Sequence, residues 1–479
     1  MLKRMTIITA GIAVVVFVTF SVVFLAEQLT ATFSTLDIRP ALLLIGLVGF
    51  NCITYVVWLN RWNIVAHTAL AFSIVAYIVP IVFLHQLDGL SSEAIDLYFQ
   101  VMAGGLFFAV LGVLAGAAIG RLYDADKLRA RAAFEEQQVR AKIRRRIIAL
   151  SGLAVLGVFV AFAGMGFIPA LTADPLTAKF FRGAYAAAYQ PVAPLYRGAT
   201  SVLTVLLPVL FLYAMKLRSG RSFLIALAAM LALFLGLLRE PAVSGALLLI
   251  GVYMAVRRKP WGFYFALLVS TYFAGGALYY LLALIGFGSF TGSPAAETTS
   301  LLAQAAAGAP DIRDQITFLT AWLVRPEYTQ GLTWLGGMIP GNNPWNPSVW
   351  SLRIVNPTQE ITAIASGGLR LPPPIWGMVS FGWPGVIGVS LLTGGIQGYL
   401  ASVAKRIIPS NSVETSIYWL VLYVALVEVL PAFFRFSYLS VLQLIIILLV
   451  FGWRTSSPPR RQRKVPERST TALPGGTPG

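Results

Sequence analysis

The residues best suited to chemistry in this sequence are charged side chains placed inside or at the ends of long apolar runs. Ionisable groups at such positions are costly, so they mark functional sites by default. Arg239 and Glu240 interrupt the stretch LGLLREPAVSGALLLIGVYM, where Pro241 is expected to end one helix just before another begins. A guanidinium held in such a tight turn presents a planar fork of donors that suits a phosphate or pyrophosphate. A structural pair with Glu240, or snorkelling of Arg239 toward headgroups, explains the same pattern.

A second pair of opposite charges lies near the C-terminus. Glu428 is deep in the run YVALVEVLPAFFRFS, and Arg435 follows two helical turns later on roughly the same face. Pro431 between them predicts a kink in the helix. The pair is either a functional group inside a helix bundle or a buried ion pair that serves the structure.

Residues 287–372 form the longest segment between apolar runs, and they combine charges with aromatic side chains. DIRDQITFLTAWLV has the periodicity of an amphipathic helix, and WLGGMIPGNNPWNPSVW is dense in Trp, Pro, Gly and Asn. Indole faces and Asn amides, Trp345 among them, suit sugar rings, although Trp is equally expected at membrane interfaces. The segment also supplies the arginines that could converge on an anionic ligand: Arg313, Arg325, Arg353 and Arg370.

Several soluble-enzyme classes are excluded by the motifs that the sequence lacks. It has no P-loop, no G-x-S-x-G and no H-E-x-x-H. The lone Cys52 and two histidines leave no material for a zinc cluster, and Asp311 with Asp314 makes a weak metal motif. We therefore expect no metal and no cofactor.

The elements that must position these residues are transmembrane helices. The chain has 479 residues, of which 57% are hydrophobic and 11% charged, whereas soluble domains carry about 25% charged residues. The predicted fold is an all-α polytopic membrane protein of about twelve transmembrane helices with one large outer loop. The expected spans are 5–25, 41–58, 66–84, 98–119, 148–168, 199–215, 222–238, 242–256, 261–286, 373–403, 415–433 and 437–453.

The distribution of basic residues predicts the orientation of these spans. Of the 36 Lys and Arg residues, 26 fall in inner segments and 10 in outer ones when the N-terminus is cytoplasmic. Cytoplasmic loops are enriched in Lys and Arg, so both termini are expected inside. In a membrane protein this placement outweighs the net charge of +17, and no nucleic-acid partner is expected. The first run lacks an A-x-A cleavage site and is expected to be a retained helix.

The same pattern divides the chain into six parts. Residues 121–147 are expected to form a cytoplasmic basic helix near anionic lipid, which is either a solvated connector or a binding element. Residues 454–479 are expected to form a disordered cytoplasmic tail. The remaining parts are the four-helix membrane segment 1–120, the central membrane helices 148–286, the external loop 287–372 and the C-terminal membrane helices 373–453.

Three stretches resemble the Wzy-type polymerases of O-antigen and exopolysaccharide repeat units. They are the arginine turn described above, GLTWLGGMIPGNNPWNPS in the outer loop, and the Pro-rich entry and Phe-Gly helix of GLRLPPPIWGMVSFGWPGVIGVSLLTGGIQGYL. FFRFSYLSVLQLIIILLV is similar to the family's late arginine before the last span. The chain departs from the family pattern at Gly341, where an arginine is usual, and near Trp376, where a glutamate is usual.

The resemblance implies a GT-C-like enzyme in the bacterial cytoplasmic (inner) membrane. Its substrates would be oligosaccharides linked to polyprenyl pyrophosphate, and its partners the lipid bilayer and other polysaccharide-assembly membrane proteins. Arg239 and Arg435 would hold the departing pyrophosphate, with Arg353 and Arg370 as further candidates and Arg325 and Trp345 as substrate contacts. Glu240, Glu327 and Glu360 are all candidates for the base that accepts the proton of the acceptor hydroxyl.

Three other functions remain open on the sequence. An O-antigen ligase is expected to use a histidine in its outer loop, and residues 287–372 contain none. A transporter or a lipid-linked glycan flippase would show internal repeats or charges at mid-membrane depth. An accessory or structural membrane protein is the third alternative.

Overall fold

The computed structural model describes most of the membrane helices and part of the outer loop. It covers residues 49–73, 77, 89–122, 125–217, 219–258, 262, 311–339, 341, 343–361, 364, 367–410 and 413–451. The expected span 5–25 and the tail 454–479 lie outside the described residues, as does the span 261–286 apart from Gly262.

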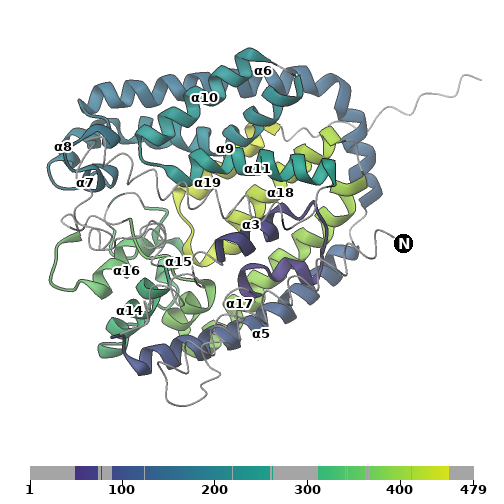
Figure 1. Ribbon diagram of the computed structural model, residues 1–479. Helices are drawn as coiled ribbons and strands as arrows, with labels where there is room; N and C mark the ends of the chain where they lie inside the picture. Colours follow the sequence, from purple (N-terminus) through teal and green to yellow (C-terminus); the bar gives the residue numbers. More distant parts are fainter. Residues whose placement is uncertain are drawn as a thin grey trace, which may run out of the picture.

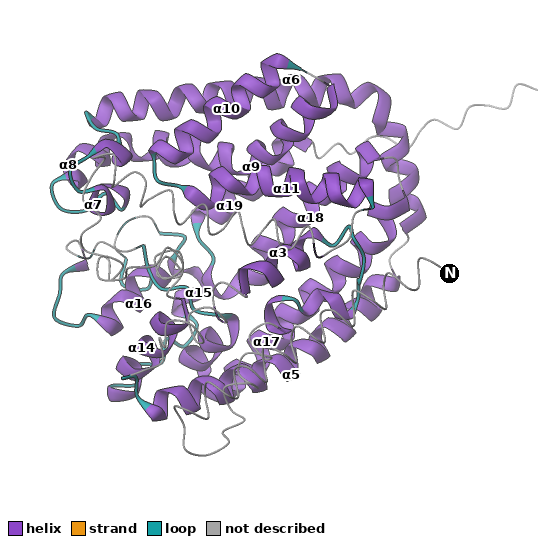
Figure 2. Ribbon diagram, viewed as in Figure 1, coloured by secondary structure: helices purple, strands orange, loops and turns teal. Residues whose placement is uncertain are grey.

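Every regular element among the described residues is a helix, as Figure 2 shows. The all-α class is therefore confirmed. The longer helices are α3 (Ile64–Ser73), α5 (Ser92–Leu122), α6 (Ala125–Met165), α9 (Ala193–Leu217), α10 (Gly220–Leu235), α11 (Arg239–Arg257), α14 (Asp311–Val324), α16 (Pro347–Val355), α17 (Pro373–Ile407), α18 (Val413–Val429) and α19 (Tyr438–Phe451). The shorter ones are α7 (Pro175–Lys179), α8 (Tyr185–Tyr189), α15 (Leu332–Gly336) and the 3-10 helices η1 (Ile53–Val56), η3 (Pro169–Leu171), η4 (Gln190–Val192), η7 (Ile408–Ser410) and η8 (Leu430–Arg435).

Four helical stretches in the described residues are long and apolar enough to cross a membrane. They are Ser92–Leu122, Arg144–Met165, Tyr185–Ala214 and Pro373–Ile407, and each overlaps an expected span. Three further apolar helices are shorter: Ile64–Ser73, Gly220–Leu235 and Tyr438–Val450. The described residues thus supply four candidate membrane-spanning helices, while the count of twelve spans and their orientation stay predictions.

Two of the expected spans are interrupted. The span 41–58 does not continue as one helix, because η1 follows Cys52 and the chain stays non-helical up to Asn63. The amide of Asn63 stabilises this irregular stretch by donating to the Trp58 carbonyl at 2.9 Å. In the span 415–433, α18 ends at Val429 and the irregular η8 follows, as expected from Pro431. Glu428 and Arg435 are both exposed, so neither side chain is buried in a helix bundle, and the choice between a functional and a structural role stays open.

The connector 121–147 is helical, as expected, but it is not a separate element. α5 ends at Leu122, and α6 begins at Ala125 and continues without a break into the membrane-spanning stretch Arg144–Met165. The connector is therefore the first half of a long helix, whose second half is the apolar stretch Arg144–Met165.

Small residues let α5 and α17 approach until their backbones touch. We call this contact the glycine seam. A Cβ on Gly112 would lie 2.1 Å from the Leu391 carbonyl oxygen, and one on Gly116 would lie 1.9 Å from that of Gly395. On the α17 side, a Cβ on Gly398 would lie 2.1 Å from the Val113 oxygen. Small residues four positions apart are the packing signature of membrane helices.

α17 begins with a short helix that folds back on the rest of the element. Its helical geometry breaks at Phe381 (φ −142°, ψ 18°) and Gly382 (φ 65°, ψ −146°). A Cβ on Gly385 would lie 2.0 Å from the Gly377 oxygen, whereas residues eight apart in a straight helix are about 12 Å apart. The expected span 373–403 therefore starts as a tight hairpin. Pro374 of its first arm packs against Gly105 of α5, and the arm after Gly382 continues along α5 in the glycine seam.

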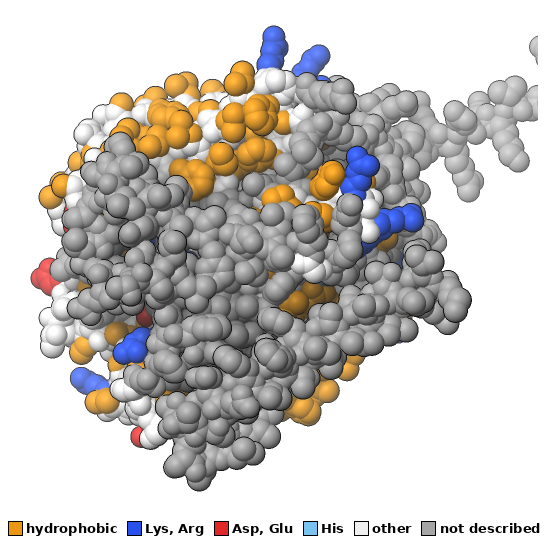
Figure 3. All heavy atoms as spheres, viewed as in Figure 1, with side chains coloured by type: hydrophobic (Ala, Val, Ile, Leu, Met, Phe, Trp, Pro, Cys, Tyr) orange, Lys and Arg blue, Asp and Glu red, His pale blue; other side chains and the backbone are white. Residues whose placement is uncertain are grey.

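Figure 1 shows α7 and α8 at the same end of the helix layers as α14, α15 and α16, away from the junction of α5 and α6. A contact joins these two groups, because a Cβ on Gly367 would lie 2.9 Å from the ring of Phe180. Figure 3 shows the molecule from the same side as Figure 1. The acidic side chains visible there lie at the end that carries α7, α8 and α14 to α16, and apolar side chains spread over α10 and α6. We call this end the loop end.

Candidate functional site

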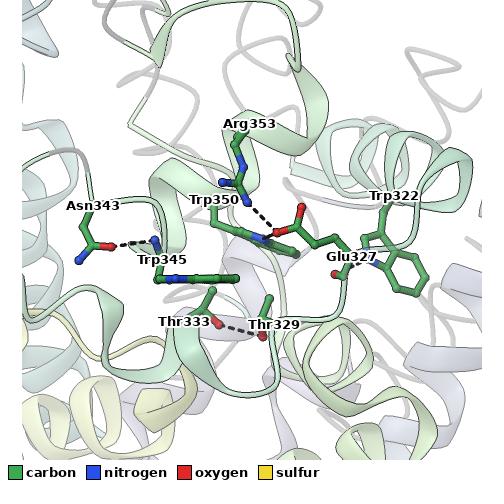
Figure 4. A network of polar contacts seen from close by, with 8 residues as sticks. All are labelled: Trp322, Glu327, Thr329, Thr333, Asn343, Trp345, Trp350 and Arg353. Carbon is green, nitrogen blue, oxygen red and sulfur yellow. Dashed lines mark hydrogen bonds and ion pairs between the residues drawn. The ribbon is translucent and has the colours of Figure 1, made fainter.

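A carboxylate held by an arginine and an indole lies at the centre of the loop end. Arg353 donates from Nη2 to Oε1 of Glu327 at 2.7 Å, and Trp350 donates to the same oxygen at 3.3 Å (Figure 4). The side chains of Arg353 and Glu327 are 39% and 41% exposed. Oε2 of Glu327 takes part in no hydrogen bond or ion pair with the described residues. One carboxylate oxygen is thus fixed, while the other has no partner among the residues that the structure describes.

The backbone around Glu327 is fixed by the hairpin of α17. The indole of Trp322 donates to the Glu327 carbonyl at 3.0 Å. The amides of Thr329 and Gln330 then donate to the carbonyls of Val379 and Ser380 at 2.9 and 3.1 Å. These carbonyls are free to accept because the break at Gly382 ends the helix and Pro384 has no N–H. The hairpin therefore sets the position of the carboxylate.

The Ser380 hydroxyl lies where three segments of the loop end meet. It accepts a hydrogen bond from the Thr329 hydroxyl at 3.1 Å and another from the Trp334 indole at 3.2 Å. The ring of Trp334 packs edge-on against those of Phe381 and Phe433, with centroids 5.7 and 5.4 Å apart. The hairpin, the residues after Glu327 and η8 are thereby packed together.

α15 connects this region to the start of α19. The amide of Phe436 donates to the Trp334 carbonyl at 3.0 Å, and that of Tyr438 donates to the Gly337 carbonyl at 3.1 Å. Gly336 lies so close to Trp345 that a Cβ there would be 1.9 Å from the Trp345 oxygen. A chain of hydrogen bonds and packed backbone therefore leads from Glu327 to Tyr438.

Tyr438 in turn holds a cation. Arg197 donates from Nη1 to the Tyr438 hydroxyl and from Nε to the Tyr189 hydroxyl, the latter at 2.6 Å. Its guanidinium carbon lies 5.5 and 5.8 Å from the centroids of the Tyr189 and Tyr438 rings. Among the described residues its partners are these two neutral side chains. A half-buried positive charge with neutral partners favours an anionic ligand.

A second arginine lies near this cation. Burial, followed by repulsion from Arg197, lowers the pKa of the Arg182 guanidinium. The two arginines come from the link between α7 and α8 and from the first turns of α9. Sequence reasoning missed Arg197, although its place in PLYRGATSVLTVLL, directly before an apolar run, is the same signal that drew attention to Arg239.

The turn before Arg239 packs against the same region. A Cβ on Gly236 would lie 2.4 Å from the Tyr196 hydroxyl, and Leu237 is buried in a left-handed conformation (φ 58°). The expectation that Pro241 ends a helix is wrong: the preceding helix ends at Leu235, and Pro241 lies in the first turn of α11. Proline is tolerated there because first-turn N–H groups have no helical partner.

The other expected site residues are placed as follows. Arg239 and Glu240 are the first two residues of α11, and their side chains lie outside the described part, so their roles stay predictions. Arg353 joins Glu327, whereas Arg325 is exposed just after α14. Arg370 is exposed, and its carbonyl accepts a hydrogen bond from Gln315 at 2.7 Å.

Two further expected residues flank α15. Trp345 is half-buried, with its amide donating to the Asn343 side chain at 2.9 Å. Arg435 is exposed at the end of η8, two residues before the bridge between Ser437 and Gly337. It therefore lies close in the chain to the contacts that tie α15 to α19.

The described residues include no group of three His, Cys, Asp or Glu side chains placed to hold a metal ion. No family model matches the chain, and neither a curated protein nor a solved structure shows significant similarity to it. The site itself offers, among the described residues, a carboxylate oxygen without a partner and a separate cation with neutral partners, both at the loop end.

Proposed function

We propose that this protein is a membrane glycosyltransferase that polymerises oligosaccharide repeat units carried on polyprenyl pyrophosphate. The reaction would take place at the outer face of the bacterial cytoplasmic membrane, with both termini of the chain in the cytoplasm. The observation that carries the proposal is the carboxylate of Glu327, which is fixed at Oε1 and has no partner at Oε2 among the described residues. The hairpin and α15 connect this carboxylate to the guanidinium of Arg197.

In this reaction Glu327 acts as the general base. Oε2 takes the proton of the acceptor hydroxyl while its oxygen attacks the anomeric carbon of the donor sugar. The bond from that carbon to the pyrophosphate oxygen breaks with inversion, and the electron pair leaves with the pyrophosphate. Arg353 and Trp350 hold Oε1, so the carboxylate is already oriented before the acceptor arrives. Glu327 thus accepts the proton, and a different group must stabilise the departing pyrophosphate.

Arginines at the loop end take the second role. Charge builds on the departing pyrophosphate, and guanidinium donors stabilise it best when they are positioned in advance. Arg197 and Arg182 join Arg239 and Arg435 as candidates for this role, because the turn before Arg239 packs against Tyr196 and Arg435 lies three residues before Tyr438. Arg325, Arg370 and Trp345 are left as contacts for the glycan.

The proposal is tested by the lipid-linked glycans that accumulate in a deletion strain. We expect single repeat units on the lipid carrier and no polymer, restored to polymer by the wild-type chain. Long lipid-linked polymer that is not transferred onward would show a ligase instead. Repeat units trapped on the cytoplasmic side of the membrane would show a flippase.

A purified system separates the polymerase from an accessory protein. The protein in detergent or nanodiscs, given only lipid-linked repeat units, is expected to form longer glycans and release polyprenyl pyrophosphate. Activity that appears only with a second membrane protein would contradict the assignment of catalysis to this chain.

A further inference from the structure

The loop end carries an apolar surface that is exposed in the described part of the chain. Four side chains of α15 and the residues after it are exposed: Leu332 (51%), Leu335 (66%), Met338 (39%) and Ile339 (55%). Thr333 and Gly336, on the opposite side of α15, are buried. Phe381 and Trp383 of the hairpin, exposed by 46% and 43%, extend the surface. We call these six residues the outer apolar patch.

The two parts of the patch, from α15 and from the hairpin, adjoin each other. A Cβ on Gly331, directly before α15, would lie 3.2 Å from the ring of Phe381, and the rings of Trp334 and Phe381 meet edge-on at 5.7 Å. The patch therefore forms one surface made by two segments that are far apart in the sequence.

The patch also continues a surface that faces lipid. Trp383, Ile387 and Leu391 are exposed and lie four residues apart, which places them on one side of α17. They belong to a helix long and apolar enough to cross the membrane. Exposed apolar side chains on a membrane-spanning helix contact hydrocarbon, and this row reaches the hairpin where the patch begins.

The sequence around the patch is unusual for a solvated loop. From Tyr328 to Leu352 the chain has no Asp, Glu, Lys or Arg, and the next charged residues on either side are Glu327 and Arg353. Apolar patches of this kind, edged by charge, mark interaction sites. An uncharged stretch with exposed Leu, Ile and Met matches the chemistry of lipid chains rather than of water.

We propose that the outer apolar patch inserts into the leaflet of the bilayer at the loop end, in contact with lipid hydrocarbon. Segment 328–339 is then part of the membrane-embedded surface rather than a loop in water. The Glu327–Arg353 pair, at the edges of the uncharged stretch, lies at the boundary between lipid and water. The inference does not depend on the proposed reaction.

Spin labels at single cysteines test the depth of the patch. In a Cys52→Ala background, Leu335→Cys and Ile339→Cys report on the patch, and Leu111→Cys, exposed by 43% on α5, serves as the lipid-facing reference. Thr358→Cys, in an exposed turn of the same loop end, is the aqueous control. The full-length variants are reconstituted in phosphatidylcholine–phosphatidylglycerol nanodiscs.

Collision rates with oxygen, which concentrates in lipid, and with a water-soluble nickel chelate are then compared. We expect the oxygen-to-nickel ratio at Leu335 and Ile339 to exceed that at Thr358 several-fold and to approach that at Leu111. Ratios equal to that of Thr358 would place the patch in water and overturn the proposal. Labels at both positions that collide with neither reagent would also overturn it, because they would show coverage by protein, such as a second copy of the chain.

Discussion

Arg197 and Tyr438 are 241 residues apart in the sequence, and a hydrogen bond from the guanidinium to the phenol oxygen joins them. Tyr438 is also the residue whose amide binds the Gly337 carbonyl at the end of α15. One residue therefore connects a cation on a membrane helix with the segment that carries the carboxylate. Substitutions at either end of this connection are expected to affect the same reaction.

Removal of the Glu327 carboxylate should abolish polymer formation. Glu327→Gln keeps the side chain's size but removes the proton acceptor, and loss of a general base typically costs about 10²–10⁴ in rate. Glu360→Gln, which changes an exposed glutamate of the same loop end, is the matched control and should retain activity. Release of polyprenyl pyrophosphate by purified protein measures both. Normal turnover by Glu327→Gln would exclude Glu327 as the base.

Arg353→Ala should reduce turnover with little change in stability. The pair with Glu327 is about two-fifths exposed, and such ion pairs contribute only about 0–1 kcal/mol. Its main effect is to fix the carboxylate, so we expect the rate to fall while the thermal midpoint of unfolding in detergent stays near that of the wild type. A large loss of folded protein would instead assign Arg353 a mainly structural role.

Arg197→Ala should be more damaging than Tyr438→Phe. The first change removes the positive charge, and loss of a positioned donor to the developing oxyanion typically costs about 10²–10³ in rate. The second removes only one hydrogen-bond acceptor for a cation that keeps Tyr189. Turnover at saturating substrate, measured with folded protein quantified by size-exclusion chromatography, distinguishes them. Equal effects of the two variants would show that Arg197 acts through packing alone.

Arg239→Ala should abolish detectable polymer, and Arg239→Lys should restore little of it. A lysine supplies a point charge but not the two directed hydrogen bonds of a guanidinium fork. Polymer length on gels and protein abundance in membranes are the measurements. Polymer of normal length from Arg239→Ala would favour the structural pairing with Glu240.

Gly116→Ala should destabilise the protein strongly, whereas Gly152→Ala should not. A Cβ at Gly116 would lie 1.9 Å from the Gly395 oxygen in the glycine seam, but one at Gly152 in α6 has nothing within 4 Å. Forced separation of packed helices typically costs about 1–3 kcal/mol or more. Thermal unfolding in detergent measures the difference, and similar midpoints for the two variants would contradict the observed backbone contact.

The sequence predicts the long helices well because hydropathy and length are local properties of the chain. α5, the second half of α6, and α9 lie where apolar runs place them. The hairpin in α17 is not predicted, because Gly382 and Pro384 permit a reversal but do not require one. The spacing of small residues in α5 and α17 is visible in the sequence, yet it does not show that the two helices are partners.

The candidate site is predictable only in part, for a similar reason. On sequence grounds Glu327 is one of three possible bases. What sets it apart in the structure is that Trp350 and Arg353 of α16 donate hydrogen bonds to its carboxylate. Arg197 is recognisable as a site residue through its hydrogen bond to Tyr438, which lies 241 residues later in the chain. Contacts of this range depend on tertiary packing, which composition and periodicity do not encode.

The two hydrogen bonds from the backbone amides of Thr329 and Gln330 to the hairpin have a consequence for divergence among related chains. The donors are main-chain atoms, so a change of side chain does not by itself remove them, and proline alone cannot donate. Thr329 is fully buried, and the left-handed backbone of Gln330 (φ 49°) favours Gly and Asn there, which limits the side chains that fit. Distant homologues could still preserve the geometry of this junction with little recognisable similarity there. An avoidance of proline at the two positions, together with a glycine at the reversal in α17, would be the remaining trace of common descent.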